Sequence, residues 1–214
     1  MFLDGLGPEW AGLSLTMPLK QAVLPLLDSL SDLARDVAAA NTVLLRDGRR
    51  HGENTDVHGI VCALADAGIT SCARAGVLGG GATARSALAA LRVLGCSSPR
   101  LVVRSEPVET LAAAERLGVR PTLSYDLDLD GCDLLISTLP AGAADRFAPY
   151  VQDVPALLDV VYDPWPTALA QACGGVVVSG ASMLLHQAAE QVRLLTGRKP
   201  PLEVMRGALP RLKG

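Results

Sequence analysis

The sequence predicts an α/β fold, in which a Rossmann-type doubly wound parallel sheet is joined to an incomplete α/β substrate domain. From residue 76 onward, short apolar runs alternate with Ala- and Leu-rich stretches of helical period, which is typical of βαβ units. A glycine-rich turn, Gly79 to Gly81, joins one apolar run to the next helical stretch. Hydrophobic residues make up 50% of the 214 positions and aromatic residues only 3%, which suits parallel strands covered on both faces by Ala-rich helices.

Two helices are predicted near the N-terminus. The first covers 18–27, because Pro18 is well suited to the first turn of a helix. The second covers 29–39, with Ser29 or Ser31 as its N-cap, since a serine oxygen accepts a hydrogen bond from a free backbone N–H there.

A β-hairpin is predicted next. Asp47-Gly48 separates two β-prone runs, and this dipeptide favours a primed two-residue turn. Thr55 or Asp56 can then cap a helix that ends at Gly68.

The remaining elements alternate between strand and helix. Strands are predicted at 77–78, 101–103, 133–137, 156–161 and 176–178. Helices are predicted at 82–94, 108–117, 182–196 and 202–209. We therefore divide the chain into a substrate domain at 1–56, a nucleotide-binding Rossmann domain at 57–180, and C-terminal helices at 181–214 that return to the substrate domain.

Composition excludes several classes of protein. A net charge of −3 and a pI near 5.6 argue against a nucleic-acid-binding surface. No apolar run reaches the ~20 residues of a membrane span, and the N-terminus has no signal-peptide pattern. The five cysteines and three histidines have no metal-ligand spacing, so we expect no metal site and a cytoplasmic protein with reduced thiols.

Lysine is rare in this chain, with 3 of the 19 basic residues, and Lys20 is the only one far from the C-terminus. Lysine can release a proton in a protein, whereas arginine cannot. Lys20 and Asp56 are therefore a candidate proton-transfer pair for a carbonyl-reducing dehydrogenase. The alternative is that Lys20 lies on the solvated face of a helix.

The glycine-rich turn has the form G-x-G-x-x-A and follows a predicted strand, as a dinucleotide site requires. The residues expected to receive the phosphates are Gly79, Gly80, Gly81, Ala82 and Thr83. Glycine-rich turns also join strands to helices without a nucleotide, which is the alternative.

The next strand ends in Arg104 and Ser105, which suit the 2′-phosphate of NADP. Glu106 lies close enough to keep NAD as an alternative, because a carboxylate there binds the ribose hydroxyls. Arg104 could also be an ordinary surface arginine.

Five motifs in order resemble the shikimate dehydrogenase family, and within it the actinobacterial type. They are Ser14-Leu15-Thr16-Met17-Pro18-Leu19-Lys20, Ala40-Asn41-Thr42, Gly52-Glu53-Asn54-Thr55-Asp56, Asp159-Val160-Val161-Tyr162-Asp163-Pro164 and Gly180-Ala181-Ser182-Met183-Leu184-Leu185-His186-Gln187. The resemblance implies NADP-dependent reversible reduction of 3-dehydroshikimate to shikimate, with Lys20 and Asp56 as the catalytic pair. It implies substrate contacts from Thr16, Asn41, Asn54, Tyr162 and Gln187.

The chain also departs from the family pattern. Val108 stands where the family's N-R-T-x-x-R motif has its second arginine, and the S-x-S that anchors the substrate carboxylate has no counterpart. We therefore expect a chain that lacks the N-terminal segment, reduces substrate weakly and associates with itself as a homodimer. Quinate or aminoshikimate dehydrogenase and a non-catalytic nucleotide-binding remnant are the alternatives.

Overall fold

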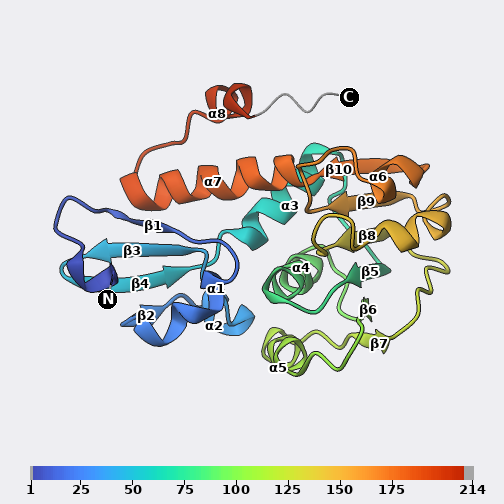
Figure 1. The fold of residues 1–214 in the computed structure, drawn as a ribbon, viewed down its shortest axis with the longest axis horizontal. Helices are drawn as coiled ribbons and strands as arrows, with labels where there is room; N and C mark the ends of the chain where they lie inside the picture. The colour runs from blue at the N-terminus through green and yellow to red at the C-terminus, as the bar shows by residue number, and fades with distance from the viewer. Residues whose placement is uncertain (1, 210–214) are drawn as a thin grey trace.

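The computed structural model describes residues 2–209. These residues form two sheets that lie side by side, and one long helix runs along both of them (Figure 1). None of the described helices is long and apolar enough to cross a membrane.

The smaller sheet has the strand order β1-β3-β4-β2. Its strands are β1 Gly12–Ser14, β2 Ser29–Leu30, β3 Thr42–Arg46 and β4 Arg49–Glu53. The predicted hairpin is β3 and β4, and both residues of its turn, Asp47 and Gly48, have positive φ, as a primed turn requires.

The first two predicted helices are shorter than expected. The first is divided into α1 Leu19–Ala22 and a 3₁₀ turn, Leu24–Leu26, because Pro25 has no N–H to continue the α-helix. The second, α2 Asp32–Val37, begins after Ser31, whose Oγ accepts from Ala34 N at 3.3 Å. Ser29–Leu30 form β2 instead of a first turn, since they pair with β4.

The larger sheet is entirely parallel and has the order β10-β9-β8-β5-β6-β7, which is the doubly wound order expected of a Rossmann fold. Its strands are β5 Ala75–Leu78, β6 Arg100–Val102, β7 Thr122–Ser124, β8 Leu134–Ser137, β9 Ala156–Asp159 and β10 Val176–Ser179. The sequence did not predict β7. The fold class is the predicted α/β class.

The remaining helices are α3 Asp56–Asp66, α4 Ala82–Val93, α5 Val108–Leu117, α6 Ala168–Ala172, α7 Gly180–Thr196 and α8 Leu202–Ala208, with 3₁₀ helices η1 Phe2–Gly5 and η3 Asp145–Tyr150. In Figure 1, α7 is the long helix that runs along both sheets, and α3 lies between them.

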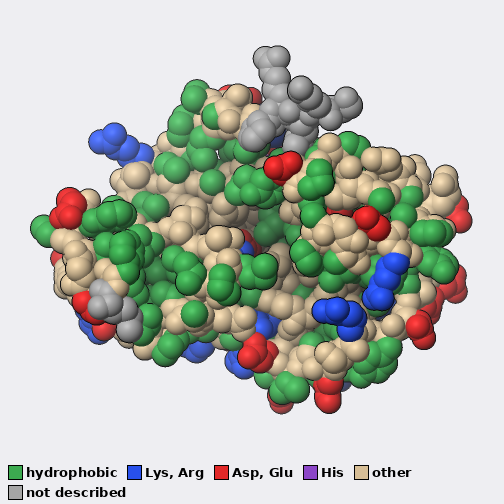
Figure 2. Space-filling model, in the orientation of Figure 1, with side chains coloured by type: hydrophobic (Ala, Val, Ile, Leu, Met, Phe, Trp, Pro, Cys, Tyr) green, Lys and Arg blue, Asp and Glu red, His purple; other side chains and the backbone are tan. Residues whose placement is uncertain are grey.

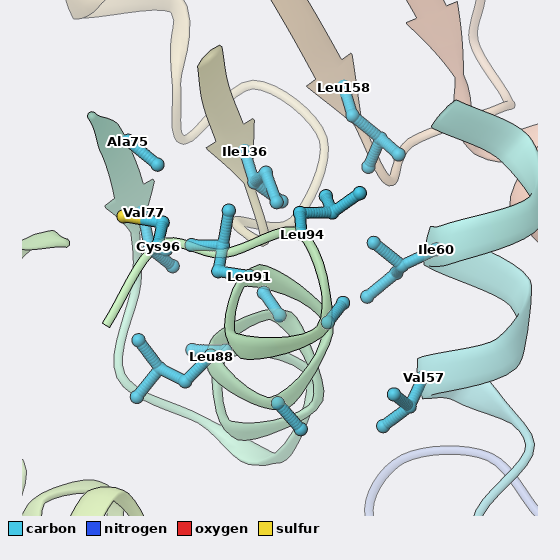
Figure 3. Packing of buried hydrophobic residues seen from close by; sticks show 14 of the residues in the cluster. Val57, Ile60, Ala75, Val77, Leu88, Leu91, Leu94, Cys96, Ile136 and Leu158 are labelled. Atoms are coloured by element: carbon cyan, nitrogen blue, oxygen red, sulfur yellow. The ribbon is translucent and has the colours of Figure 1, made fainter. Parts of the chain in front are cut away.

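Both faces of the larger sheet are buried, because successive residues of each strand enter opposite cores. Val77 packs with α3 and α4, whereas its neighbour Leu78 packs with Phe147 of η3 and Leu169 of α6. Figure 3 shows the first core, where Val57 and Ile60 of α3 point toward α4.

Candidate active site between the two sheets

A cavity of about 360 Å³ lies where the two sheets meet. The space-filling view shows the surface hollowed between the two halves of the molecule (Figure 2). The lining residues are Ser14, Leu15, Thr16, Lys20, Asp56, Thr83, Val160, Tyr162, Gly180, Met183, Leu184 and Gln187. We call this cavity the central pocket. Five of the predicted site residues, from both halves of the chain, therefore share one cavity with Thr83 of the glycine-rich turn.

Lys20 and Asp56 form the charged centre of the central pocket. Lys20 Nζ donates to Asp56 Oδ2 at 2.6 Å, and the two side chains are only 15% and 4% exposed. Asp56 is the first residue of α3, where the helix dipole favours a carboxylate. The other carboxylate oxygen accepts from Asn41 Nδ2 at 2.9 Å, so the carboxylate is fixed from both sides.

Asn41 connects the polar residues behind the central pocket. Its Nδ2 donates to Gln187 Oε1 at 3.1 Å and to Thr55 Oγ1 at 2.9 Å, and its Oδ1 accepts from Thr55 N at 2.8 Å. The side chain is almost completely buried and does not line the cavity. Asn41 therefore holds Asp56 and Gln187 in place, and its contact with a substrate stays a prediction.

Gln187 reaches this network because α7 crosses close to α3 at Gly59. A Cβ at position 59 would lie 2.8 Å from Met183 O and 2.9 Å from Gln187 Cβ. Only glycine allows so close an approach of the two helices without displacing α7.

Asn54 lies at the start of α3. It is buried, does not line the central pocket, and its Oδ1 accepts from Asp56 N and Val57 N at the start of α3. Its Nδ2 donates to Ala39 O at 3.0 Å. Asn54 therefore fixes the start of α3 through Oδ1, and its contact with a substrate, like that of Asn41, stays a prediction.

Thr16 and Tyr162 line the central pocket from opposite halves of the chain. The sequence did not single out Ser14, which also lines it. Its signal was its place in the motif that also carries Thr16 and Lys20. Both residues carry a hydroxyl group at the wall of the cavity.

A second cavity, of about 540 Å³, lies at the end of β5 and β6. Its lining residues are Gly79, Gly80, Val102, Val103, Arg104, Ser105, Pro107, Leu139, Pro140, Ala143, Arg146 and Phe147. We call it the cofactor pocket. Gly79 has φ +107°, and a Cβ there would lie 2.6 Å from Thr138 Oγ1, so the tight turn requires glycine.

The glycine-rich turn separates the two cavities. Gly79 and Gly80 line the cofactor pocket, whereas Thr83 lines the central pocket. Gly81 and Ala82, which we also predicted to bind phosphate, line neither cavity; Gly81 is the N-cap of α4 and Ala82 its first residue. The turn therefore connects the cofactor pocket with the central pocket that holds Lys20.

One buried acid lies beside the central pocket. Burial raises the pKa of Asp159 above its usual value, and hydrogen bonds from Thr167 Oγ1 at 2.7 Å and Val161 N at 3.3 Å oppose that rise. Asp159 ends β9 and fixes the start of the loop that carries Tyr162.

A doubly wound sheet with a glycine-rich turn, next to a pocket with a paired lysine and carboxylate, defines a dinucleotide-linked dehydrogenase. Two sequence-family models match the chain: the shikimate dehydrogenase substrate binding domain over residues 2–43, and the shikimate 5′-dehydrogenase C-terminal domain over residues 180–209. The NADP(+) shikimate dehydrogenase of Oleidesulfovibrio alaskensis is 38% identical over 93% of this chain and 75% of its own length. The chain belongs to the shikimate dehydrogenase family, which makes it an oxidoreductase.

Solved structures agree with this assignment. The shikimate dehydrogenase of Mycobacterium tuberculosis matches with a TM-score of 0.88 and 38% identity, over 96% of this chain and 80% of that one. The Thermus thermophilus enzyme, in complex with NADP(H) and shikimate, matches with a TM-score of 0.78 and 34% identity, over 94% of this chain and 78% of that one. The family predicted from the motifs is therefore confirmed.

Proposed function

We propose that this chain catalyses the NADP-dependent, reversible reduction of 3-dehydroshikimate to shikimate. The observation that carries the proposal is the Lys20–Asp56 pair, which faces the same cavity as Thr83 of the cofactor turn. The names of the relatives, NADP(+) shikimate dehydrogenases, support the same reaction.

Lys20 is the proton donor and acceptor in the proposed reaction. Bound NADPH supplies the hydride that a carbonyl carbon accepts. Lys20 Nζ then donates a proton to the carbonyl oxygen, and in the reverse direction it accepts the proton of the hydroxyl group. Asp56 Oδ2 holds the amine in place, while Asn41 fixes the carboxylate from behind.

The walls of the central pocket suit a small polyol acid. Thr16, Tyr162 and Gln187 bring two hydroxyls and an amide to the cavity, and these groups both donate and accept hydrogen bonds. A site of this kind discriminates strongly against analogues that lack a hydroxyl, because its polar groups are then left unpaired. We propose these three residues, with Ser14, as the substrate contacts.

NADP is the proposed cofactor because Arg104 and Ser105 line the cofactor pocket, whereas Glu106, the residue that favoured NAD, is not one of its lining residues. Gly79 and Gly80 leave room for the phosphates. A charge-assisted contact of this kind contributes about 1.5–3 kcal/mol, or about ten- to a hundredfold in affinity.

The test is oxidation of NADPH and, separately, of NADH with 3-dehydroshikimate and with 3-dehydroquinate as substrates. We expect turnover with 3-dehydroshikimate and NADPH to exceed the other three combinations. Preference for 3-dehydroquinate would indicate a quinate dehydrogenase. Cofactor binding without any turnover would support the non-catalytic remnant and refute the proposed activity.

The proposal also includes a location in the cell and an oligomeric state. We propose a cytoplasmic location, which the five free cysteines support, because thiols remain reduced there. We also propose a homodimer, since β1 is an edge strand of the smaller sheet and Phe2 and Trp10, which precede it in the chain, are exposed hydrophobic side chains. Light scattering of the purified chain over a concentration series measures its mass, and a monomer throughout would contradict the dimer.

A further inference from the structure

The cofactor pocket contains a second arginine that the sequence motifs do not indicate. Arg104 follows β6, whereas Arg146 belongs to η3, the 3₁₀ helix that follows β8 in the sequence. Both residues line the same 540 Å³ cavity, and no Asp or Glu is among its described lining residues. Figure 2 shows basic side chains gathered over the β5–β6 end of the larger sheet. The cavity is therefore suited to an anion.

Both guanidinium groups are free to bind a ligand. Among the residues that the structure describes, no carboxylate lies within ion-pair distance of Arg104 or Arg146. The Arg146 guanidinium lies 4.5 Å above the ring of Phe147, a buried core residue that also lines the cavity. This contact holds Arg146 at the wall of the cavity without using its N–H donors.

Two unpaired cations in one cavity repel each other, and a bound anion would offset that repulsion. In a chain with a pI near 5.6, their presence together indicates an anion site. Guanidinium groups match a phosphate dianion in charge and in the geometry of their donors. Position 108, where the motif comparison places a second arginine, is an exposed valine and does not line the cavity. The second cation must therefore come from elsewhere in the fold.

We propose that Arg146 is this second cation and that it binds the 2′-phosphate of NADP together with Arg104. The proposal rests on the proposed NADP-linked function. It makes Arg146 a specificity-determining residue, which acts on the choice between NADPH and NADH and not on the proton transfer at Lys20.

The experiment measures binding of NADPH and NADH by fluorescence titration, without substrate, for the native chain and for Arg146→Gln, Arg104→Gln and Arg92→Gln. Arg92 is an exposed arginine of α4 outside both cavities, so it controls for loss of one surface charge. Adenosine 2′,5′-bisphosphate and ADP serve as smaller probes with and without the 2′-phosphate. Circular dichroism checks that each variant is folded.

We expect Arg146→Gln to weaken NADPH and adenosine 2′,5′-bisphosphate about tenfold, the effect of one charge-assisted contact, while NADH and ADP change less than twofold. Arg104→Gln should show the same selective loss of affinity as Arg146→Gln, and Arg92→Gln should bind all four probes like the native chain. Unchanged NADPH affinity in Arg146→Gln, with a loss in Arg104→Gln, would overturn the inference and leave the proposed function intact. An equal loss of NADPH and NADH would also overturn it, because Arg146 would then contact the adenine. Equal affinity of the native chain for NADPH and NADH would instead refute the NADP assignment itself.

Discussion

Replacement of Lys20 by methionine removes the proposed proton donor and keeps the length and the apolar part of the side chain. General acid–base catalysis contributes roughly 10²–10⁴-fold, so kcat for NADPH oxidation should fall by that factor, or about 2.7–5.4 kcal/mol in the activation barrier. Cofactor affinity should change little, because Lys20 lines the central pocket and not the cofactor pocket.

The same substitution has a structural cost that must be measured separately. Asp56 Oδ2 loses its 2.6 Å partner in a site where the side chain is only 4% exposed, while Oδ1 keeps the bond from Asn41. One buried acceptor without a donor costs about 1–3 kcal/mol. At about 2–4 °C for each kcal/mol in a chain of this size, Tm should fall by several degrees.

The assay compares Lys20→Met, Asp56→Asn and the double variant under conditions in which all three are folded, with Lys199→Met as the control at an exposed lysine. Because the two side chains act as one hydrogen-bonded unit, the double variant should lose little more activity than Lys20→Met alone. A Lys20→Met variant with native kcat would refute the assignment of proton transfer to Lys20. Strict additivity would show that the pair does not act as a unit.

Three further substitutions test the structural roles of residues around the two pockets. Arg85→Met removes a side chain that is 1% exposed and bonded to two backbone carbonyls at 2.7 and 3.0 Å, so unfolding should become easier by roughly 2–4 kcal/mol in denaturant titration; native stability would refute its structural role. Gly59→Ala should displace α7 and raise KM for 3-dehydroshikimate severalfold, with unchanged NADPH affinity, because its Cβ would overlap Gln187. Asp159→Asn tests the raised pKa of that buried acid. The folded protein holds this proton at pH values where the unfolded chain has lost it, so the native chain loses stability as the pH rises from the unfolded pKa through the folded one. Thermal melts from pH 4 to 8 should therefore show less loss of stability on raising the pH in the variant, and a curve parallel to that of the native chain would contradict this.

Local signals in the sequence predicted the hairpin and the ends of α4, α5, α7 and α8 closely, but not the ends of the first two helices. Gly68, predicted to end the helix that Thr55 or Asp56 caps, has φ +81°, where a side chain would be strained. The missed strands are two or three residues long, and their partners are distant in the sequence. β7, for example, pairs with β6 over Thr122–Ser124, and nothing in that tripeptide requires a strand until β6 lies beside it.

Residues that belong to a sequence motif were predicted as site residues. A residue that reaches a pocket only through tertiary packing was missed. Lys20 and Asp56 were identified because each stands in a motif of reactive residue types, and the fold brings them together. Asn54 lies in the same motif as Asp56 but is turned inward, and no sequence pattern distinguishes a lining amide from a buried one. Arg146 was missed because its place in the cofactor pocket depends on η3 packing against the sheet.

The alignment of the two cavities depends on residues that line neither of them. Arg85 of α4 donates to Val37 O and Ala38 O at the end of α2, and Arg116 of α5 donates to Asp36 O at 3.1 Å. Two cations of the cofactor half thus cap the negative end of a helix in the other half.

Glu109 of α5 adds a further link between the halves, because it accepts from Arg85 and also from Gln21, the neighbour of Lys20. The backbone leads from the capped end of α2 directly to Asn41, which fixes Asp56. The distance between the proton donor and the cofactor turn is therefore set by this polar interface. Substitutions of Arg85, Arg116, Glu109 or Gln21 should alter kcat through geometry, although none of these residues lines either cavity.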